Sequence, residues 1–305
     1  MLRPVSAIVY YSAPKDRTAL VAVMASSAPV AIVTGGNSGM GMGIVRQLVK
    51  RGWKVAIADI NENKEFAEEL GEASSFHKCN VADYDSQAEM FQQVWDKYKR
   101  LDALCANAGI VDKSSIFIFE HRGSDKIPPK PDLLTTDVDY KGVVYGTQLA
   151  IHFMRKNEVP GGKIVVTASV AAVVPHESYP EYDGAKAAAV NFVRATARIL
   201  KSKENISINA VCPGIVHTSI IPQEMVDAVT PDCLTPVSTI VAAYQRCLDD
   251  DALFGKVIEC STDKQFFLEA PSLANGRFSK RAVTVWDPLF KMYHKESSGL
   301  PDAIP

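Results

Sequence analysis

The chain has 305 residues, and its 33 basic and 35 acidic side chains give a formal net charge of −2. This balance does not favour nucleic acid or an anionic membrane as a partner. With 47% hydrophobic and 22% charged residues, the composition is that of an ordinary soluble globular protein. The length suits one large domain or two small ones.

The six cysteines are scattered, without the spacing that zinc ligands require. Most of them lie in apolar, strand-like contexts, so we expect reduced, buried thiols in a cytoplasmic protein and no metal site. No apolar run reaches the ~20 residues that a membrane span requires.

Residues 1–27 loosely resemble a secretory signal, because Arg3, Lys15 and Arg17 precede a short apolar run. That run merges with residues 30–33, which the predicted fold needs as a core strand. Unpaired cysteines also argue against an oxidising compartment. We therefore predict that residues 1–27 form a flexible N-terminal extension.

From residue 30 onwards, short apolar runs alternate with segments of helical periodicity, a pattern that is typical of βαβ units. Such runs suit strands that are buried on both faces of a parallel sheet. We predict an α/β fold in a single domain, residues 28–261: a Rossmann-type doubly wound parallel sheet of about seven strands with helices on both faces. Strands are expected near residues 30–33, 54–58, 74–78, 101–106, 164–168, 206–211 and 256–260, and helices include 132–156 and 237–248.

A glycine-rich segment, residues 34–41, lies between the first predicted strand and the next helix. Glycines there permit a tight turn and let a pyrophosphate approach the backbone, while the N-terminus of the helix faces the phosphate charge. A plain glycine-rich turn is the alternative, and the position between strand and helix makes it the weaker one. The candidate cofactor contacts in this segment are Gly35, Asn37, Ser38, Gly39, Met40 and Gly41.

The second predicted strand ends in Asp59. A carboxylate at this place can accept hydrogen bonds from an adenosine ribose and would repel a 2′-phosphate. No arginine or lysine lies in the glycine segment or immediately after Asp59 to bind such a phosphate. The sequence therefore favours NAD over NADP as the cofactor.

Tyr182 and Lys186 lie one helical turn apart, so that the lysine ammonium can stabilise a phenolate beside it. Ser169, at the end of the preceding strand, could hold a substrate oxygen next to the phenol. A tyrosine and a lysine at this spacing also occur by chance on solvated helix faces. The other motifs support the functional interpretation, because ligands bind at the carboxyl ends of the strands in an open parallel sheet.

With these residues in place, the chain resembles the short-chain dehydrogenase/reductase family over about residues 29–261. Within this family it is most similar to the 15-hydroxyprostaglandin dehydrogenase-like group and to fungal natural-product relatives. The matching motifs are T-G-x-x-x-G-x-G at 34–41, Asp59, N-A-G at 107–109, Ser169, Y-x-x-x-K at 182–186, and P-G at 213–214 with Thr218.

The resemblance implies that Tyr182 is the general acid/base, that Lys186 assists it and binds the nicotinamide ribose, and that Ser169 positions the reacting oxygen. It also implies an NAD cofactor and a homodimer or homotetramer formed through the helices that carry Asp139 and Tyr182. The further cofactor contacts that it implies are Ile60, Asn80, Val81, Asn107, Ala108, Gly109, Pro213, Gly214, Val216 and Thr218.

Two positions depart from the family pattern. Asn80 replaces the usual aspartate that holds the adenine, but it keeps an acceptor for the adenine amino group. Asp139 replaces the asparagine that normally supports a proton relay from the lysine. An ionised Asp139 cannot donate a hydrogen bond and would attract the Lys186 ammonium, which could weaken the help to Tyr182. A neutral or otherwise paired aspartate in a working enzyme is the alternative.

We therefore expect an NAD-dependent oxidoreductase that interconverts a secondary alcohol and a ketone on a lipophilic small molecule. The alternatives are a non-redox isomerase, cyclase or dehydratase on the same fold and, less favoured, a non-catalytic dinucleotide sensor. The loops at 112–131, 170–181 and 215–236 would build the substrate pocket. Residues 262–305 are rich in apolar side chains and are expected to pack on the substrate cleft or a neighbouring subunit, or simply to buttress their own domain.

Overall fold

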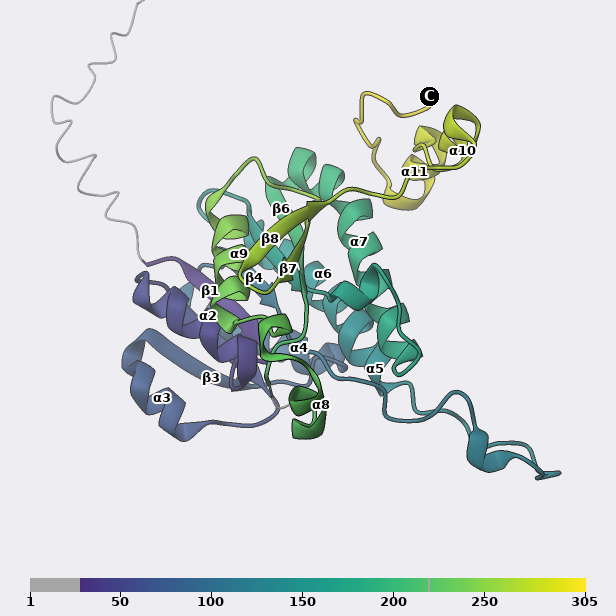
Figure 1. The fold of residues 1–305 in the computed structure, drawn as a ribbon. Coiled ribbons are helices and arrows are strands. Elements are labelled where there is room, and N and C mark those ends of the chain that lie inside the picture. The colour runs from purple at the N-terminus through teal and green to yellow at the C-terminus, as the bar shows by residue number, and fades with distance from the viewer. Residues whose placement is uncertain (1–27, 219) are drawn as a thin grey trace, which may run out of the picture.

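The computed structural model describes residues 28–218 and 220–305, so the predicted extension 1–27 lies outside the described residues. One mostly parallel sheet of eight strands runs through the chain in the order β3-β2-β1-β4-β5-β6-β7-β8 (Figure 1). Only the last pair, β7 and β8, is antiparallel. The strands are β1 (Val30–Thr34), β2 (Lys54–Asp59), β3 (Ser74–Lys78), β4 (Ala103–Ala106), β5 (Gly162–Thr167), β6 (Ile206–Pro213), β7 (Val257–Ser261) and β8 (Lys264–Leu268).

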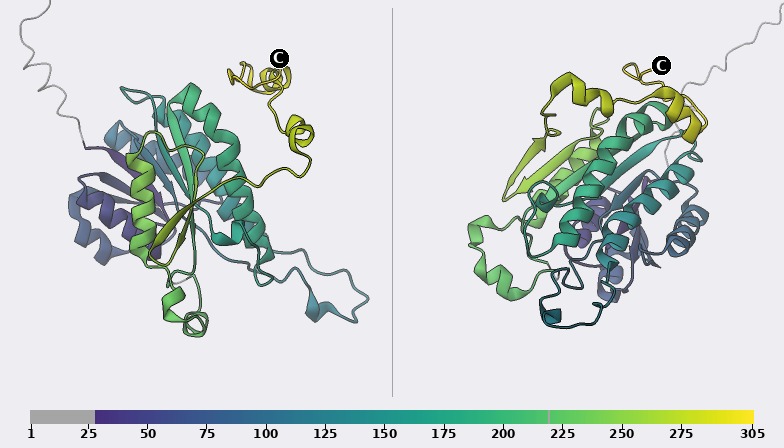
Figure 2. Two further views of the ribbon diagram at one scale, coloured as in Figure 1. Left: turned by 45° about the horizontal axis from the view of Figure 1, so that its top comes forward. Right: turned by 90° about the vertical axis from the view of Figure 1, so that its right-hand side faces the viewer.

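Helices cover both faces of the sheet, which confirms the predicted Rossmann-type α/β fold (Figure 2). The helices α2, α3 and α9 lie on one face and α4, α6 and α7 on the other. Their bounds are α2 (Gly39–Lys50), α3 (Lys64–Leu70), α4 (Tyr84–Tyr98), α6 (Gly142–Met154), α7 (Pro180–Glu204) and α9 (Val237–Asp249), with shorter helices α5 (Leu134–Thr136), α8 (Gln223–Ala228), α10 (Gly276–Ala282) and α11 (Asp287–His294).

The central strands consist of apolar residues because each is covered on both faces. Alternate side chains of a strand point to opposite faces, and the two cores follow this alternation. Ile32, Leu104 and Ile164 pack in the core under α4, α6 and α7. Their neighbours Val33, Cys105 and Val165 pack under α2 and α9. Burying each large apolar side chain is worth roughly 1.5–3 kcal/mol, so these two layers fix the sheet that carries the strand ends.

The strands β1 and β4 are neighbours in the sheet. From β1 the chain continues to β2 on one side, and from β4 it continues to β5 on the other side, so the strand order reverses between β1 and β4. In open α/β sheets this topological switch point is where a crevice opens at the carboxyl ends of the strands. The glycine segment follows β1 and the N-A-G motif follows β4. The fold therefore brings both motifs to one crevice.

The helix predicted over residues 132–156 is not continuous. It begins as α5, passes through a wider π-helical turn, η3 (Asp137–Lys141), and continues as α6. A π-helical turn accommodates an extra residue and often marks a functional site. Periodicity near 3.6 residues did not reveal it, because the buried residues of α5 and η3 are the polar Thr135 and Asp139, which give no apolar stripe whose shift could be seen.

Residues 264–268 lie beyond the predicted domain boundary at residue 261 and form β8, the eighth strand, which pairs with β7. The remaining tail, with α10 and α11, lies beside the C-terminal end of α7 (Figure 2). Arg198 bonds to Asp302, and the Lys203 ammonium lies 2.5 Å from a Glu296 carboxylate oxygen. Within this chain the tail therefore contacts α7, and its packing on the substrate cleft or a neighbouring subunit stays a prediction. Among the described residues, no helix is long and apolar enough to cross a membrane.

A truncation pair tests this boundary. A chain that ends after Leu268 keeps β8 and loses exposed ion pairs, which contribute little. A chain that ends after Ser261 leaves the edge of β7 unpaired, so we expect its melting temperature to fall by about 5 °C or more below that of the first truncation. Thermal unfolding measures both, and equal melting temperatures would show that β8 does not belong to the cooperative unit.

Candidate active site

The glycine segment after β1 forms a turn that only glycine accommodates. Gly35 and Gly39 have φ angles of +63° and +46°, in the left-handed region. A Cβ atom on Gly41 would lie 2.0 Å from the Gly35 carbonyl oxygen, and one on Gly35 would lie 2.9 Å from Cα of Ala108. Helix α2 begins at Gly39 and has no acidic residue in its first turn. This backbone cradle at a helix N-terminus fits the pyrophosphate of a dinucleotide.

Asp59 ends β2 beside this segment. Its carboxylate oxygens accept hydrogen bonds from the backbone N–H groups of Asn37 (3.1 Å) and Asn61 (3.2 Å), which hold it at the strand end. Asp59 also lines a surface hollow together with Lys64, a basic residue that the sequence analysis did not consider. A second hollow of about 510 Å³ suits an adenosine and brings together the predicted residues Gly35, Ser38, Asp59, Ile60, Asn80, Val81, Ala108 and Gly109.

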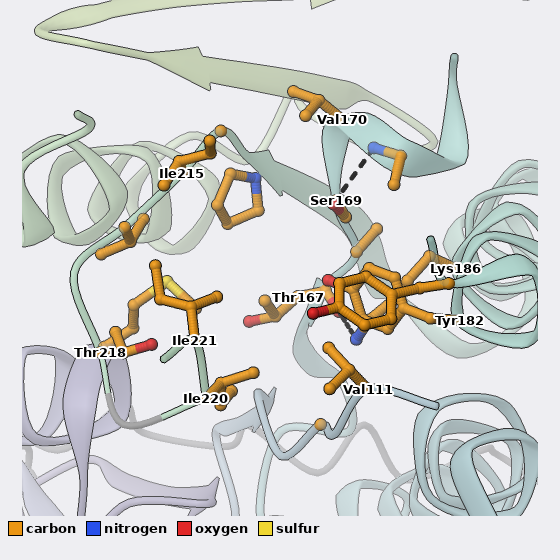
Figure 3. Close-up of a pocket in the computed structure, with 18 of the residues that line it drawn as sticks. Val111, Thr167, Ser169, Val170, Tyr182, Lys186, Ile215, Thr218, Ile220 and Ile221 are labelled. Atoms are coloured by element: carbon orange, nitrogen blue, oxygen red, sulfur yellow. Dashed lines mark hydrogen bonds between the residues drawn. The ribbon is translucent and has the colours of Figure 1, made fainter. Parts of the chain in front are cut away.

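A cavity of about 300 Å³ lies at the carboxyl ends of β4, β5 and β6 (Figure 3). It adjoins that hollow, since Gly109 lines both. Ser169 and Tyr182 both project into it, from the loop after β5 and from α7. Apolar side chains form much of its remaining wall, including Val111, Val170 and Ile215. The predicted residues that it brings together are Met40, Asn107, Gly109, Ser169, Tyr182, Lys186, Pro213, Gly214, Val216 and Thr218.

Lys186 is 2% exposed, and its ammonium is fixed by three partners. Nζ donates to the Thr167 carbonyl oxygen at 3.0 Å, lies 3.2 Å from Oδ2 of Asp139, and lies 5.5 Å from the centre of the Tyr182 ring. Burial lowers the pKa of Lys186, but the charge of Asp139, together with Tyr182, raises it by more, so the net shift is upward. The lysine therefore keeps its positive charge beside the phenol.

Asp139 lies in the π-helical turn, behind Lys186 and outside the cavity lining. Its Oδ1 accepts the backbone N–H of Ile110 at 2.9 Å, and its side chain is otherwise enclosed at 1% exposure. Burial raises the pKa of Asp139, and the charge of Lys186 opposes that shift. The structure shows the contact that the first of the two sequence-based possibilities describes, an aspartate that attracts the Lys186 ammonium. Whether this contact weakens the help to Tyr182 stays a prediction.

Ser169 lies two residues beyond Thr167, the last residue of β5. Its Oγ accepts the backbone N–H of Ala171 at 3.1 Å, which caps a short 3-10 turn (Figure 3). This contact uses a lone pair of the hydroxyl and leaves its proton available to a ligand oxygen. Ser169 is therefore fixed in place as a hydrogen-bond donor on the cavity wall.

Two acidic residues that the sequence did not single out hold the start of α7. The helix begins at Pro180 and its own N-cap residue makes no side-chain cap. Instead the Asp112 carboxylate accepts the N–H groups of Glu181 (3.1 Å) and Tyr182 (2.7 Å). Glu181 in turn accepts the N–H of Thr136 at 2.8 Å. Asp112 is 70 positions from Tyr182 in sequence, so no local spacing indicated this contact.

Residues 29–227 match the model of the short chain dehydrogenase family. Together with the cavity and the glycine segment, this match shows that the chain belongs to the short-chain dehydrogenase/reductase family of oxidoreductases. It is 50% identical over 292 residues to the short-chain dehydrogenase/reductase prx6 of Penicillium rubens, covering 90% of this chain and 97% of that protein.

More distant relatives agree with this assignment. The chain is 28% identical to human 15-hydroxyprostaglandin dehydrogenase [NAD(+)], covering 77% of this chain and 91% of that one. A short-chain type dehydrogenase/reductase from Mycobacterium marinum has a TM-score of 0.69 at 21% identity, with 78% and 95% of the chains covered. A 3-ketoacyl-(acyl-carrier-protein) reductase from Brucella melitensis complexed with NADH has a TM-score of 0.66 at 21% identity, with 76% and 96% covered. These structures show the same fold.

The Asp139–Lys186 pair predicts a distinct alkaline stability profile. Because the pKa of folded Lys186 is raised, the unfolded chain loses this proton first as the pH passes about 10, so the free energy of unfolding falls as the pH rises. In Asp139→Asn the main raising influence is gone and burial remains, so the pKa of Lys186 drops and this fall becomes shallower. Urea denaturation between pH 9 and about pH 11 measures the two slopes.

Asp132→Asn is the matched control, because it removes the same charge from an exposed aspartate that accepts the backbone N–H of Leu134 at 2.9 Å. Its slope is expected to equal that of the wild-type chain. Identical slopes in all three proteins would mean that Asp139 does not hold the proton on Lys186.

Proposed function

We propose that this chain is an NAD-dependent oxidoreductase that interconverts a secondary alcohol and a ketone on an apolar small molecule, with Tyr182 as the general acid/base. The observation that carries the proposal is the meeting of Ser169, Tyr182 and buried Lys186 at one cavity. That cavity shares Gly109 with the hollow suited to a dinucleotide. An acid/base group, a charge to stabilise it and a cofactor site thus lie together.

In the oxidative direction, the phenolate of Tyr182 takes the hydroxyl proton of the alcohol as its carbon–oxygen double bond forms. Lys186 stabilises the phenolate before this transfer, and Ser169 donates a hydrogen bond to the reacting oxygen. A bound nicotinamide would supply the acceptor for the hydride of the carbinol carbon, so the two electrons and the proton are accounted for. In the reductive direction, Tyr182 returns the proton to the developing alkoxide.

The residues that would hold the cofactor line the cavity and the adjoining hollow of about 510 Å³. The glycine segment would bind the pyrophosphate, Asp59 the adenosine ribose, and Asn80 with Val81 the adenine. Lys186 would bind the nicotinamide ribose, and Thr218 the carboxamide. Thr218 supports this arrangement by its position, since a Cβ on Gly39 would lie 3.0 Å from its methyl group. Ile60, Pro213, Gly214 and Val216 would complete the contacts.

Asp59 supports NAD over NADP, because its carboxylate lies where a 2′-phosphate would approach. Lys64, which lines a surface hollow together with Asp59, is the feature that favours NADP, because its positive charge could attract a 2′-phosphate. The human relative carries NAD(+) in its name, and the Brucella reductase is complexed with NADH. The predicted homodimer or homotetramer and the cytoplasmic location stay predictions.

Replacing Tyr182 tests the catalytic role. We expect Tyr182→Phe to lose turnover by at least about 100-fold while NADH still binds, because only the proton-transferring hydroxyl is removed. Tyr179→Phe is the matched control, since Tyr179 lines the same cavity one turn away and has no proposed role in proton transfer. The assay screens secondary alcohols with NAD and ketones with NADH, following the absorbance of the reduced nicotinamide.

Turnover that survives in Tyr182→Phe would refute the role of the tyrosine. Products of unchanged hydrogen content in the wild-type reaction would favour an isomerase or cyclase instead. Loss of water alone would favour a dehydratase.

Replacing Asp59 tests the cofactor preference. Asp59→Ala removes the like charge that opposes a 2′-phosphate, so we expect the ratio of the NADPH Kd to the NADH Kd to fall by about tenfold or more. Glu65→Ala removes an exposed acid from the same hollow and is expected to change the ratio less. Fluorescence titration measures the six constants, one for each cofactor with the wild type and each variant. An unchanged ratio in Asp59→Ala would place the determinant elsewhere.

A further inference from the structure

The hydroxyl of the buried Tyr244 contacts Thr167, a residue of the cavity wall, from the face of the sheet opposite to α7. Tyr244 belongs to α9, is 1% exposed, and heads the largest fully buried side chains of the described residues. Its ring packs in the core under α2 and α9, on the face opposite to α7. Its hydroxyl lies 2.6 Å from Oγ1 of Thr167, the last residue of β5. An apolar ring would fill this space equally well, so the hydroxyl itself needs an explanation.

The directions of the hydrogen bonds around Thr167 can be worked out. The Asn107 amide Nδ2 faces the carbonyl oxygens of Thr34 (3.1 Å) and Gly35 (3.3 Å), which only accept. Its Oδ1 must therefore face Thr167, whose hydroxyl donates to it at 3.1 Å. Since the single proton of Thr167 is used there, the Tyr244 hydroxyl is the donor to Thr167. The chain of donors thus runs from Tyr244 through Thr167 to Asn107.

The end of this chain lies against the glycine segment. A Cβ on Gly41 would lie 2.9 Å from the Asn107 Nδ2, and one on Gly35 would lie 3.3 Å from it. The amide therefore supports the backbone that approaches the pyrophosphate. Hydrogen bonds in series polarise one another, so a donor behind Thr167 strengthens the bonds that Asn107 makes to this backbone.

Burial raises the pKa of Tyr244 well above its ordinary value, and the neighbouring Cys105 thiol adds to the shift. The hydroxyl thus keeps its proton and remains a donor. The main-chain carbonyl of Thr167 meanwhile accepts from Lys186. Thr167 is therefore the point where contacts from both faces of the sheet meet.

We propose that Tyr244 is a positioning residue for the dinucleotide, acting through Thr167 and Asn107 on the glycine segment. This inference rests on the proposed function, because it assumes that a dinucleotide binds there. It differs from a purely structural role, in which the hydroxyl would stabilise the fold and leave cofactor affinity unchanged.

The test compares NADH binding with thermal stability in the full chain. Tyr244→Phe removes one hydroxyl and is expected to raise the Kd for NADH about fivefold, the effect of roughly one hydrogen bond. Thr167→Val removes the middle donor and should do the same, whereas Thr167→Ser keeps the hydroxyl and should restore affinity. The double variant Tyr244→Phe/Thr167→Val should bind no worse than Thr167→Val alone, because both act in one chain.

Tyr98→Phe is the matched control. The Tyr98 hydroxyl lies 3.2 Å from Oγ of Ser75 on β3, and Tyr98 lines neither the cavity nor the adjoining hollow. Its loss should therefore affect stability and leave the NADH Kd unchanged. A Tyr244→Phe protein that melts earlier but binds NADH like the wild type would overturn the proposal. If Tyr244→Phe fails to fold, unchanged affinity in Thr167→Val overturns it equally. A wild-type chain that binds neither NADH nor NADPH would refute the proposed function, and this inference with it.

Discussion

The arrangement of the site depends on holding the charge of one lysine out of water. Lys186 is almost completely enclosed, and an ammonium in that position is tolerated only when charged and polar groups surround it. Its partners come from three elements: the carbonyl of Thr167 from β5, the carboxylate of Asp139 from the π-helical turn, and the ring of Tyr182 from its own helix. Satisfying this charge therefore ties together the strand end, the turn and the helix that carry the candidate chemistry.

Asp139 gives this chain a different balance from an asparagine at the same place. An amide would hold its neighbours without charge, whereas the carboxylate keeps Lys186 protonated and also attracts it away from the phenol. The backbone N–H of Ile110 and the wide turn hold the carboxylate in position. Asp139 thus keeps Lys186 positively charged, but it also competes with Tyr182 for the attraction of that charge. In the proposed mechanism, how strongly Tyr182 is activated follows from the balance between these two effects.

Short sequence patterns were enough to predict the features that depend on residues close together in the chain. The apolar runs of β1 and β6 and the glycine segment allowed the sheet, the residues of the hollow proposed for the cofactor and most of the cavity residues to be predicted. The missed features depend on distant contacts. Asp112 caps α7 from 70 positions away, and Tyr244 reads as an ordinary core residue on the apolar stripe of its helix until its hydroxyl is seen beside Thr167. The strand β8 was missed because it is short, half-exposed and lies in a segment that resembles a tail.

The central claim is that the cavity aligns a carbinol carbon with a nicotinamide while Tyr182 takes the hydroxyl proton. The most direct measurement uses a substrate alcohol that carries deuterium on the carbinol carbon, with NAD and the wild-type chain. We expect the deuterium to appear at C4 of the reduced nicotinamide, on one face of the ring. Deuterium released to the solvent, or retained in a product of unchanged oxidation state, would contradict it.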